Sequence, residues 1–190
     1  MEFTIIYILN FIFSLLGLII AVFIGLRVIS KYFEYGRREF LLIGVVFILL
    51  TEPWWPSILL FLSLIITGSY LKIEIILLLG NIFLPLTTLF WLVACNNLLN
   101  YKRKKMIYTI FIIHGILFEI FLFYFILTDP SEIGEISGCV DVNYGTFVSL
   151  YHLTILIVAL VTCSLFAKVC INSDNPETEV KGKLILLALC

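Results

Sequence analysis

The sequence predicts an all-α, polytopic helical membrane protein, and its composition and charge pattern carry that prediction. Hydrophobic residues make up 62% of the 190-residue chain and charged residues only 13%, whereas soluble globular domains are about half apolar and a quarter charged. Five apolar stretches each reach the roughly 20 residues that a helix needs to cross a bilayer. We therefore expect a single helical domain of a cell membrane, crossing the bilayer several times and surrounded by lipid.

Orientation is predicted from the loops between these stretches. The expected complete spans lie at about residues 3–26, 40–67, 73–99, 106–127 and 146–170. Lys and Arg cluster after the first, third and fifth spans, while the loop at 128–145 holds four acidic residues and no basic one. By the positive-inside rule this alternation predicts an extracytoplasmic N-terminus. It also explains the basic cluster at 102–105, so the charge pattern does not indicate a nucleic-acid partner.

The second and third spans are both interrupted. The segment TEPWWPS at 51–57 places a carboxylate, two prolines and two indoles inside the second span. Prolines remove backbone donors and break a helix, which is tolerated at membrane depth only where protein or water supplies new partners. A re-entrant turn here would move the cluster at 102–105 outside, so one kinked crossing is the better interpretation. Gly80-Asn81 and Pro85 predict a similar break in the third span.

Helix-start signals follow the fourth and fifth spans. Asp129-Pro130-Ser131-Glu132 combines a cap, a proline at the first helical position and a capping-box glutamate, which predicts a short surface helix ended by Gly134. Asn175-Pro176-Glu177 likewise predicts a helix over 176–190. Only seven apolar residues follow Lys183, about 10 Å of helix against a bilayer core of roughly 30 Å. We therefore expect a partial sixth span and a C-terminally truncated fragment.

Four sequence segments support a resemblance to a known family. They are EPWWPS at 52–57, GNIFLPL at 80–86, TDPS at 128–131, and SDNPE at 173–177 followed by KGKL at 181–184. In this order they resemble a family of uncharacterised archaeal heptahelical (7TM) membrane proteins, across essentially the whole chain. The resemblance implies two further spans beyond residue 190. It brings no activity, cofactor or catalytic residue.

Three polar residues are predicted to lie at a similar depth in neighbouring spans. Counted from the cytoplasmic helix ends, Glu52 and Glu119 lie about 18 to 20 Å up, and Asn81 reaches a similar level. Ionisable groups at membrane depth are by default candidate functional sites. Two desolvated carboxyls sharing a site would hold one proton between them, as in a proton relay or a cation site. The alternative is that each glutamate is protonated and hydrogen-bonded to a neighbouring helix as part of the packing.

Four further side chains are weaker or ambiguous candidates. Trp54 and Trp55 are interpreted either as an aromatic belt at the outer interface or as the wall of a ligand pocket. His114 and Glu119 are five residues apart, about 140° around a helix, so they are not expected to bind one metal. His152 lies beside the acidic loop, where histidine titrates in the range that senses external pH, although an ordinary core histidine also fits. No metal ligand set and no cofactor is predicted.

The expected function is a receptor- or sensor-like heptahelical module with a ligand or proton site around Glu52, Trp54, Trp55, Asn81 and Glu119. Its output would pass to a cytoplasmic signalling partner or to a missing C-terminal region. One alternative is a transporter or proton-coupled carrier, for which paired broken helices are typical. Another is a non-catalytic membrane scaffold subunit. Phosphate-loop, nucleophile-elbow and zinc-protease motifs are absent from the sequence, so enzymatic activity is not indicated.

Overall fold

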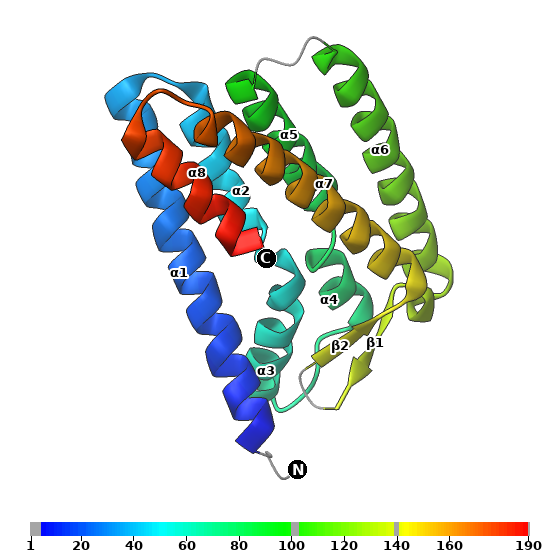
Figure 1. Ribbon diagram of the computed structural model, residues 1–190. Coiled ribbons are helices and arrows are strands. Elements are labelled where there is room, and N and C mark those ends of the chain that lie inside the picture. The colour runs from blue at the N-terminus through cyan, green and yellow to red at the C-terminus, as the bar shows by residue number, and fades with distance from the viewer. Residues whose placement is uncertain (1–4, 100–102, 139–140, 190) are drawn as a thin grey trace.

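The computed structural model describes residues 5–99, 103–138 and 141–189, so Phe3, Lys102 and Cys190 lie outside the described residues. In this part of the chain five helical segments are long and apolar enough to cross a membrane (Figure 1). They are Ile5–Tyr35, Arg38–Thr67, Ile73–Leu99, Lys104–Thr128 and Thr146–Ile171. These segments match the five predicted stretches and confirm a predominantly helical fold.

The first helix, α1 (Ile5–Tyr35), extends nine residues beyond its predicted end at residue 26. Lysine and arginine are good helix formers, so the basic residues end the apolar stretch without ending the helix. The chain turns at Gly36, whose φ of 68° is in the left-handed region that favours glycine. It then forms α2 (Arg38–Leu49), which packs against α1.

Two glycines bring α1 and α2 into close contact. A Cβ atom added to Gly25 would lie 2.6 Å from the carbonyl oxygen of Gly44, and one added to Gly44 would lie equally close to the carbonyl oxygen of Gly25. Both positions therefore exclude a side chain. Small residues at such a crossing let two helix backbones approach, which gains dispersion contacts that a larger residue would prevent.

The two predicted breaks are present and lie against each other. The second span consists of α2, a 3₁₀ turn η1 (Glu52–Trp54) and α3 (Trp55–Thr67), and Figure 1 shows α3 continuing below α2. The third consists of α4 (Ile73–Leu79) and α5 (Leu84–Leu99). A Cβ atom on Gly80 would lie 2.5 Å from Cγ of Pro56. Glycine in one break therefore accommodates proline in the other.

The core is formed by α3, α4, α6 (Lys104–Thr128) and α7 (Thr146–Ile171). Its fully buried residues come from all four helices and from the loop after α6. They are Leu60, Ile76, Leu77, Leu122, Ile133 and Val148. Several of these residues lie in α3 and α4, the helices next to the two breaks. The breaks in the second and third spans therefore border the core.

The loop between α6 and α7 differs from the prediction. The expected surface helix is a single 3₁₀ turn, η2 (Pro130–Glu132), capped by Asp129, whose Oδ1 accepts from the Ser131 amide at 3.2 Å. The amide of Asp129 donates to the Phe125 carbonyl oxygen at 2.8 Å. That amide is therefore committed to the end of α6, and the capping box expected with Glu132 does not form.

A β-hairpin follows this turn and was not predicted. Strand β1 (Gly134–Ser137) pairs antiparallel with β2 (Asp141–Tyr144). A Cβ atom on Gly134 would lie 3.3 Å from Cδ2 of Leu77 in α4, so the hairpin lies directly on the helical core. Burial of Val142 against this surface gives β2 one apolar face, which stabilises a short strand pair that would be marginal alone.

The C-terminal helix α8 (Pro176–Leu189) begins as predicted. Oδ1 of Asn175 caps it by accepting from the Glu177 amide at 2.9 Å. On its exposed surface Lys181 donates to Glu177 at 2.6 Å, and this hydrogen bond lowers the pKa of the Glu177 carboxyl. Gly182 packs α8 against α7, because a Cβ atom there would lie 2.8 Å from Cβ of Cys170.

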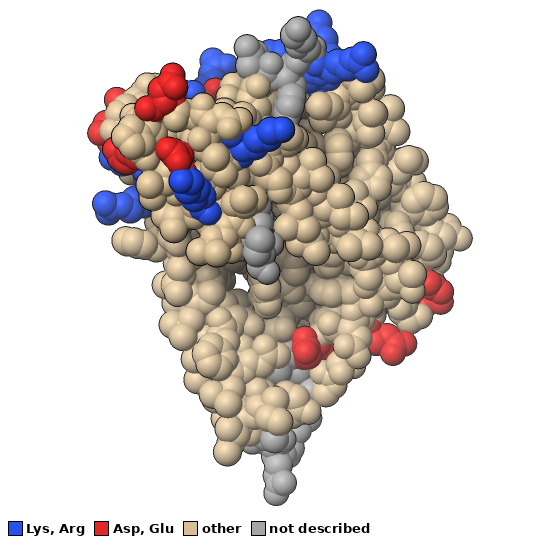
Figure 2. Space-filling view, viewed as in Figure 1, with Lys and Arg blue, Asp and Glu red and all other residues tan. Residues whose placement is uncertain are grey.

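Charged side chains gather at the two ends of the bundle, and the basic ones lie at one of these ends. Figure 2 shows basic side chains at the end that holds the start of α6 and the α7–α8 connection. Acidic side chains lie both at this end, near the start of α8, and near the hairpin, and the surface between the two ends is largely uncharged on the face shown. Such an uncharged band between two polar ends suits insertion into a bilayer.

Candidate functional site

Glu52 links the two broken helices. The residue begins η1, directly after α2 ends, and its side chain is 0% exposed. Its Oε1 atom accepts a hydrogen bond of 2.7 Å from the backbone amide of Phe83, which lies in the break between α4 and α5. A continuous helix would direct that amide to the carbonyl oxygen of Leu79, four residues earlier. The break frees the Phe83 amide, and the carboxyl of the neighbouring span satisfies it.

Asn81 lies in the same break and is also 0% exposed. Its Nδ2 atom donates to the Leu77 carbonyl oxygen at 2.7 Å, which closes the end of α4. Its Oδ1 atom and the Oε2 atom of Glu52 are both buried and have no hydrogen-bond partner within the described residues. Two buried acceptors without donors are costly. A proton on Glu52, a water molecule or a small cation would each relieve this cost.

Tyr144 connects the hairpin to the break in the second span. Its hydroxyl donates to the Pro53 carbonyl oxygen at 3.1 Å. Burial raises the pKa of the Tyr144 phenol, so the hydroxyl stays protonated and remains a donor well above neutral pH. The Tyr144 ring also meets the ring of His152 edge to face, with centroids 5.2 Å apart. The imidazole Nε2 of His152 is buried and unpartnered within the described residues.

Sequence reasoning missed Tyr144 and the Phe83 amide as members of the site. The alternation of Val142 and Tyr144 with polar residues, ended by Gly145, is typical of a half-buried strand. This signal could have placed Tyr144 on the inward face of β2. The role of Phe83 is carried by its backbone, so the type of its side chain gives no signal.

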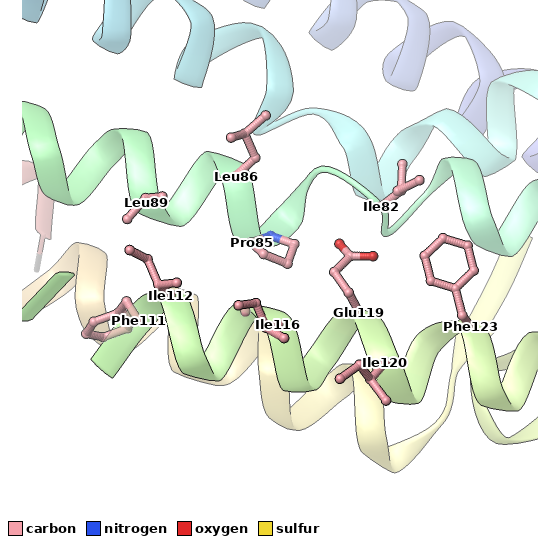
Figure 3. A pocket seen from close by; sticks show the side chains of 11 residues that line it. Ile82, Pro85, Leu86, Leu89, Phe111, Ile112, Ile116, Glu119, Ile120 and Phe123 are labelled. Carbon is pink, nitrogen blue, oxygen red and sulfur yellow. The ribbon is translucent and has the colours of Figure 1, made fainter. Parts of the chain in front are cut away.

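Glu119 lies on the opposite side of the α4–α5 break from the helix that carries Glu52. It is half-buried on α6, and Figure 3 shows its carboxyl pointing between Ile82 and Pro85. Glu119 lines a cavity of about 630 Å³ between α5 and α6. Glu52 and Asn81 are not among the residues that line this cavity. The structure therefore places Glu52 and Asn81 at the two facing breaks, and Glu119 in a separate groove.

The two tryptophans of the break have different surroundings. Trp54 is 53% exposed and lines a groove beside α1, together with Asn10 and Ser14. Trp55 donates its indole N–H to Oγ1 of Thr51 at 3.1 Å, and its ring meets the edge of the Phe83 ring at 6.2 Å. Trp55 therefore packs beside the Glu52 link, while Trp54 faces away from it.

His114 is separate from Glu119, as their five-residue spacing predicts. Its ring stacks on the Tyr151 ring with centroids 4.9 Å apart, and it lines a different cavity, between α6 and α7. Across residues 5–99, 103–138 and 141–189, no group of three or more His, Cys, Asp or Glu side chains is placed to hold a metal ion.

Comparisons of this chain with family models, curated proteins and solved structures found no match. The resemblance to archaeal heptahelical proteins stays a prediction. The functional interpretation of the site therefore rests on its geometry.

Proposed function

We propose that this chain is a sensor-like, multi-pass module of the cell membrane in which protonation of Glu52 alters the contact between two broken helices. One observation carries the proposal. The buried Glu52 carboxyl of the second span accepts a 2.7 Å hydrogen bond from the Phe83 amide of the third, and its other oxygen has no partner within the described residues.

Protonation changes what this carboxyl can bind. As a carboxylate, Glu52 accepts a charge-assisted hydrogen bond from the Phe83 amide. With a proton on Oε2 the group becomes a donor, and the Phe83 amide loses its charged acceptor. The protonated carboxyl therefore binds the Phe83 amide less strongly. A shift of the two breaks relative to each other would carry the change along α5 to the basic end of the bundle.

The charge distribution supports a cytoplasmic location for that basic end. Among the described residues outside the spans, the hairpin end holds Glu132, Glu135 and Asp141, and Lys72 is the one basic residue in the chain between the second and third spans. Positive charge on the cytoplasmic side favours an N-terminus outside the cell. The output would then reach a cytoplasmic partner, or a part of the protein beyond residue 190 in a heptahelical arrangement.

Hydrogen exchange of the Phe83 amide tests the proposal directly. In the parent protein, held in lipid nanodiscs, protection of this amide should fall as the pH is lowered through the titration of Glu52. Glu52→Gln keeps an acceptor but cannot titrate, so its Phe83 protection should show no such step. Comparing the two proteins at each pH removes the intrinsic pH dependence of exchange. Glu119→Gln is the matched control and should retain the step.

A parent protein whose Phe83 protection follows that of Glu52→Gln at every pH would contradict the proposal. A step that persists in Glu52→Gln would assign the response to another group.

A proton-coupled carrier is the second candidate, favoured by the two discontinuous helices with buried polar groups at their breaks. Flux measured with a pH-sensitive dye in proteoliposomes distinguishes the two functions. Proton movement that is lost in Glu52→Gln supports the carrier. A pH-dependent Phe83 amide without any proton movement supports the sensor.

A further inference from the structure

A groove lies between α5 and α6, beside the α4–α5 break (Figure 3). Its volume of about 630 Å³ is within the 300 to 1,000 Å³ range that is typical of small-molecule sites. The groove walls are aliphatic and aromatic apart from one carboxyl. Ile116 and Ile120 on its rim are more than half exposed, so the groove opens sideways into the surroundings of the bundle.

Among the described residues, Glu119 is the one ionisable side chain that lines this groove. Its carboxyl forms no hydrogen bond or ion pair within the described residues, and it points into the groove between Ile82 and Pro85 (Figure 3). An unpaired carboxyl among apolar walls is costly, because nothing replaces the water it would bind in solution. A ligand that carries a positive charge on an apolar body would remove this cost and cover the walls together.

The packing of the two helices creates the groove. Gly115 of α6 packs on Pro85 of α5, where an added Cβ atom would lie 2.9 Å from Cβ of Pro85. This contact holds α5 and α6 together beside Glu119. The break between α4 and α5 lies just before Pro85, so the third span has no regular helical surface opposite the Glu119 carboxyl. The resulting hollow is therefore part of the helix packing and does not depend on a flexible loop.

The depth of Glu119 restricts the ligand class. The residue lies fifteen positions after Lys104 and nine before Thr128 in α6, about 22 Å and 14 Å from the two helix ends. The headgroup of a two-chain phospholipid stays at the bilayer surface and does not reach this depth. A single-chain amphiphile enters from the hydrocarbon and can present its polar end to the carboxyl.

We propose that this groove binds a single-chain amphiphile with a protonated primary amine, with its ammonium group at Glu119 and its alkyl chain along the walls formed by Leu86, Leu89 and Ile116. The ammonium supplies the charge and the N–H donors that the carboxyl lacks, and the chain covers the exposed apolar rim. The inference concerns a ligand of Glu119, a different carboxyl from the Glu52 of the proposed function.

Photoaffinity labelling in nanodiscs tests this assignment with dodecylamine that carries a diazirine in its chain. We expect saturable labelling of α5 and α6 around the groove, competed by unlabelled dodecylamine and much less by dodecanol, which has the same chain without the charge. Loss of the charged partner in Glu119→Gln should weaken the apparent affinity roughly ten- to hundredfold.

Two further variants separate charge, space and folding. Ile116→Trp keeps the carboxyl but fills the groove from an exposed position, so it should abolish saturable labelling even if Glu119→Gln fails to fold. Glu135→Gln removes an exposed carboxyl in β1 and should bind like the parent. Glu52→Gln leaves Glu119 and the groove lining in place, so its saturable labelling should persist, which keeps this test distinct from that of the proposed function.

Three results would overturn the inference. One is labelling spread as heavily over α1 and α7 as over the groove, which would indicate ordinary lipid contact. Another is equal competition by dodecanol, because the charge would then not contribute. The third is parent-like affinity in a folded Glu119→Gln variant, or in Ile116→Trp.

Discussion

Replacing Glu52 with leucine removes the acceptor of the buried Phe83 amide, and its cost can be worked from the structure. Leucine fills much of the same volume, so the main loss is the 2.7 Å hydrogen bond. A buried N–H group left without a partner costs about 1–3 kcal/mol. Glutamine instead keeps an oxygen that can accept from the Phe83 amide. We therefore expect Glu52→Leu to unfold with a free energy about 1–3 kcal/mol lower than that of Glu52→Gln.

Comparing leucine with glutamine isolates this hydrogen bond, because both variants lack the buried charge. Unfolding can be measured in mixed micelles of increasing SDS fraction, followed by tryptophan fluorescence, since Trp55 packs beside Phe83. Glu135→Leu, at an exposed position of β1, controls for the loss of a carboxylate and should stay within about 0.5 kcal/mol of the parent. Equal free energies of unfolding for Glu52→Leu and Glu52→Gln would refute the reasoning.

Three further predictions concern packing, the hairpin and the last helix. Gly44→Leu places a side chain where a Cβ atom already meets neighbours at 2.5 Å, so it should lower stability by about 1–3 kcal/mol. Gly17→Leu, which meets nothing within 4 Å, should not destabilise in the same SDS titration, and equal losses would contradict the helix contact. Tyr144→Phe removes the 3.1 Å hydrogen bond to the Pro53 carbonyl and should lower the free energy of unfolding by about 0.5–1.5 kcal/mol. Hydrogen exchange of the β2 amides should become faster. Parent-like exchange would argue against a stabilising contact between β2 and the break in the second span. Asn175→Ala removes the cap of α8 and should lower the stability of this helix by about 0.5–2 kcal/mol. The loss should be seen as faster amide exchange in the first turn of α8. Unchanged exchange would show that packing on α7 is enough to hold the helix start.

Local chemistry explains which structural features were predictable. Pro53 and Pro56 interrupt the second span because proline lacks the amide proton and clashes with the preceding turn. Asn175 starts α8 because a short side-chain acceptor satisfies the free amides of the first helical turn. Such effects act over three or four residues, so they are visible in the sequence without knowledge of the fold.

The departures from prediction arise where distant contacts compete with local signals. The capping pattern at Asp129 produces one 3₁₀ turn, because the next residues gain more by forming a hairpin against α4. Trp54 and Trp55 are adjacent, yet one packs beside the Glu52 link and the other faces α1. Their place in the break of the second span was predictable, but the direction of each ring depends on the helices around it.

The sequence by itself determined the helical class, the five apolar stretches, the two breaks and the start of α8, because composition, periodicity and proline chemistry are local properties. Only the tertiary structure decided how the breaks meet. Glu52 binds the Phe83 amide 31 residues away, and Tyr144 binds the Pro53 carbonyl across 91 residues. It also placed Glu119 in a groove of its own. Depth along a helix can be counted from the sequence, but the direction in which a side chain points is set by helix packing.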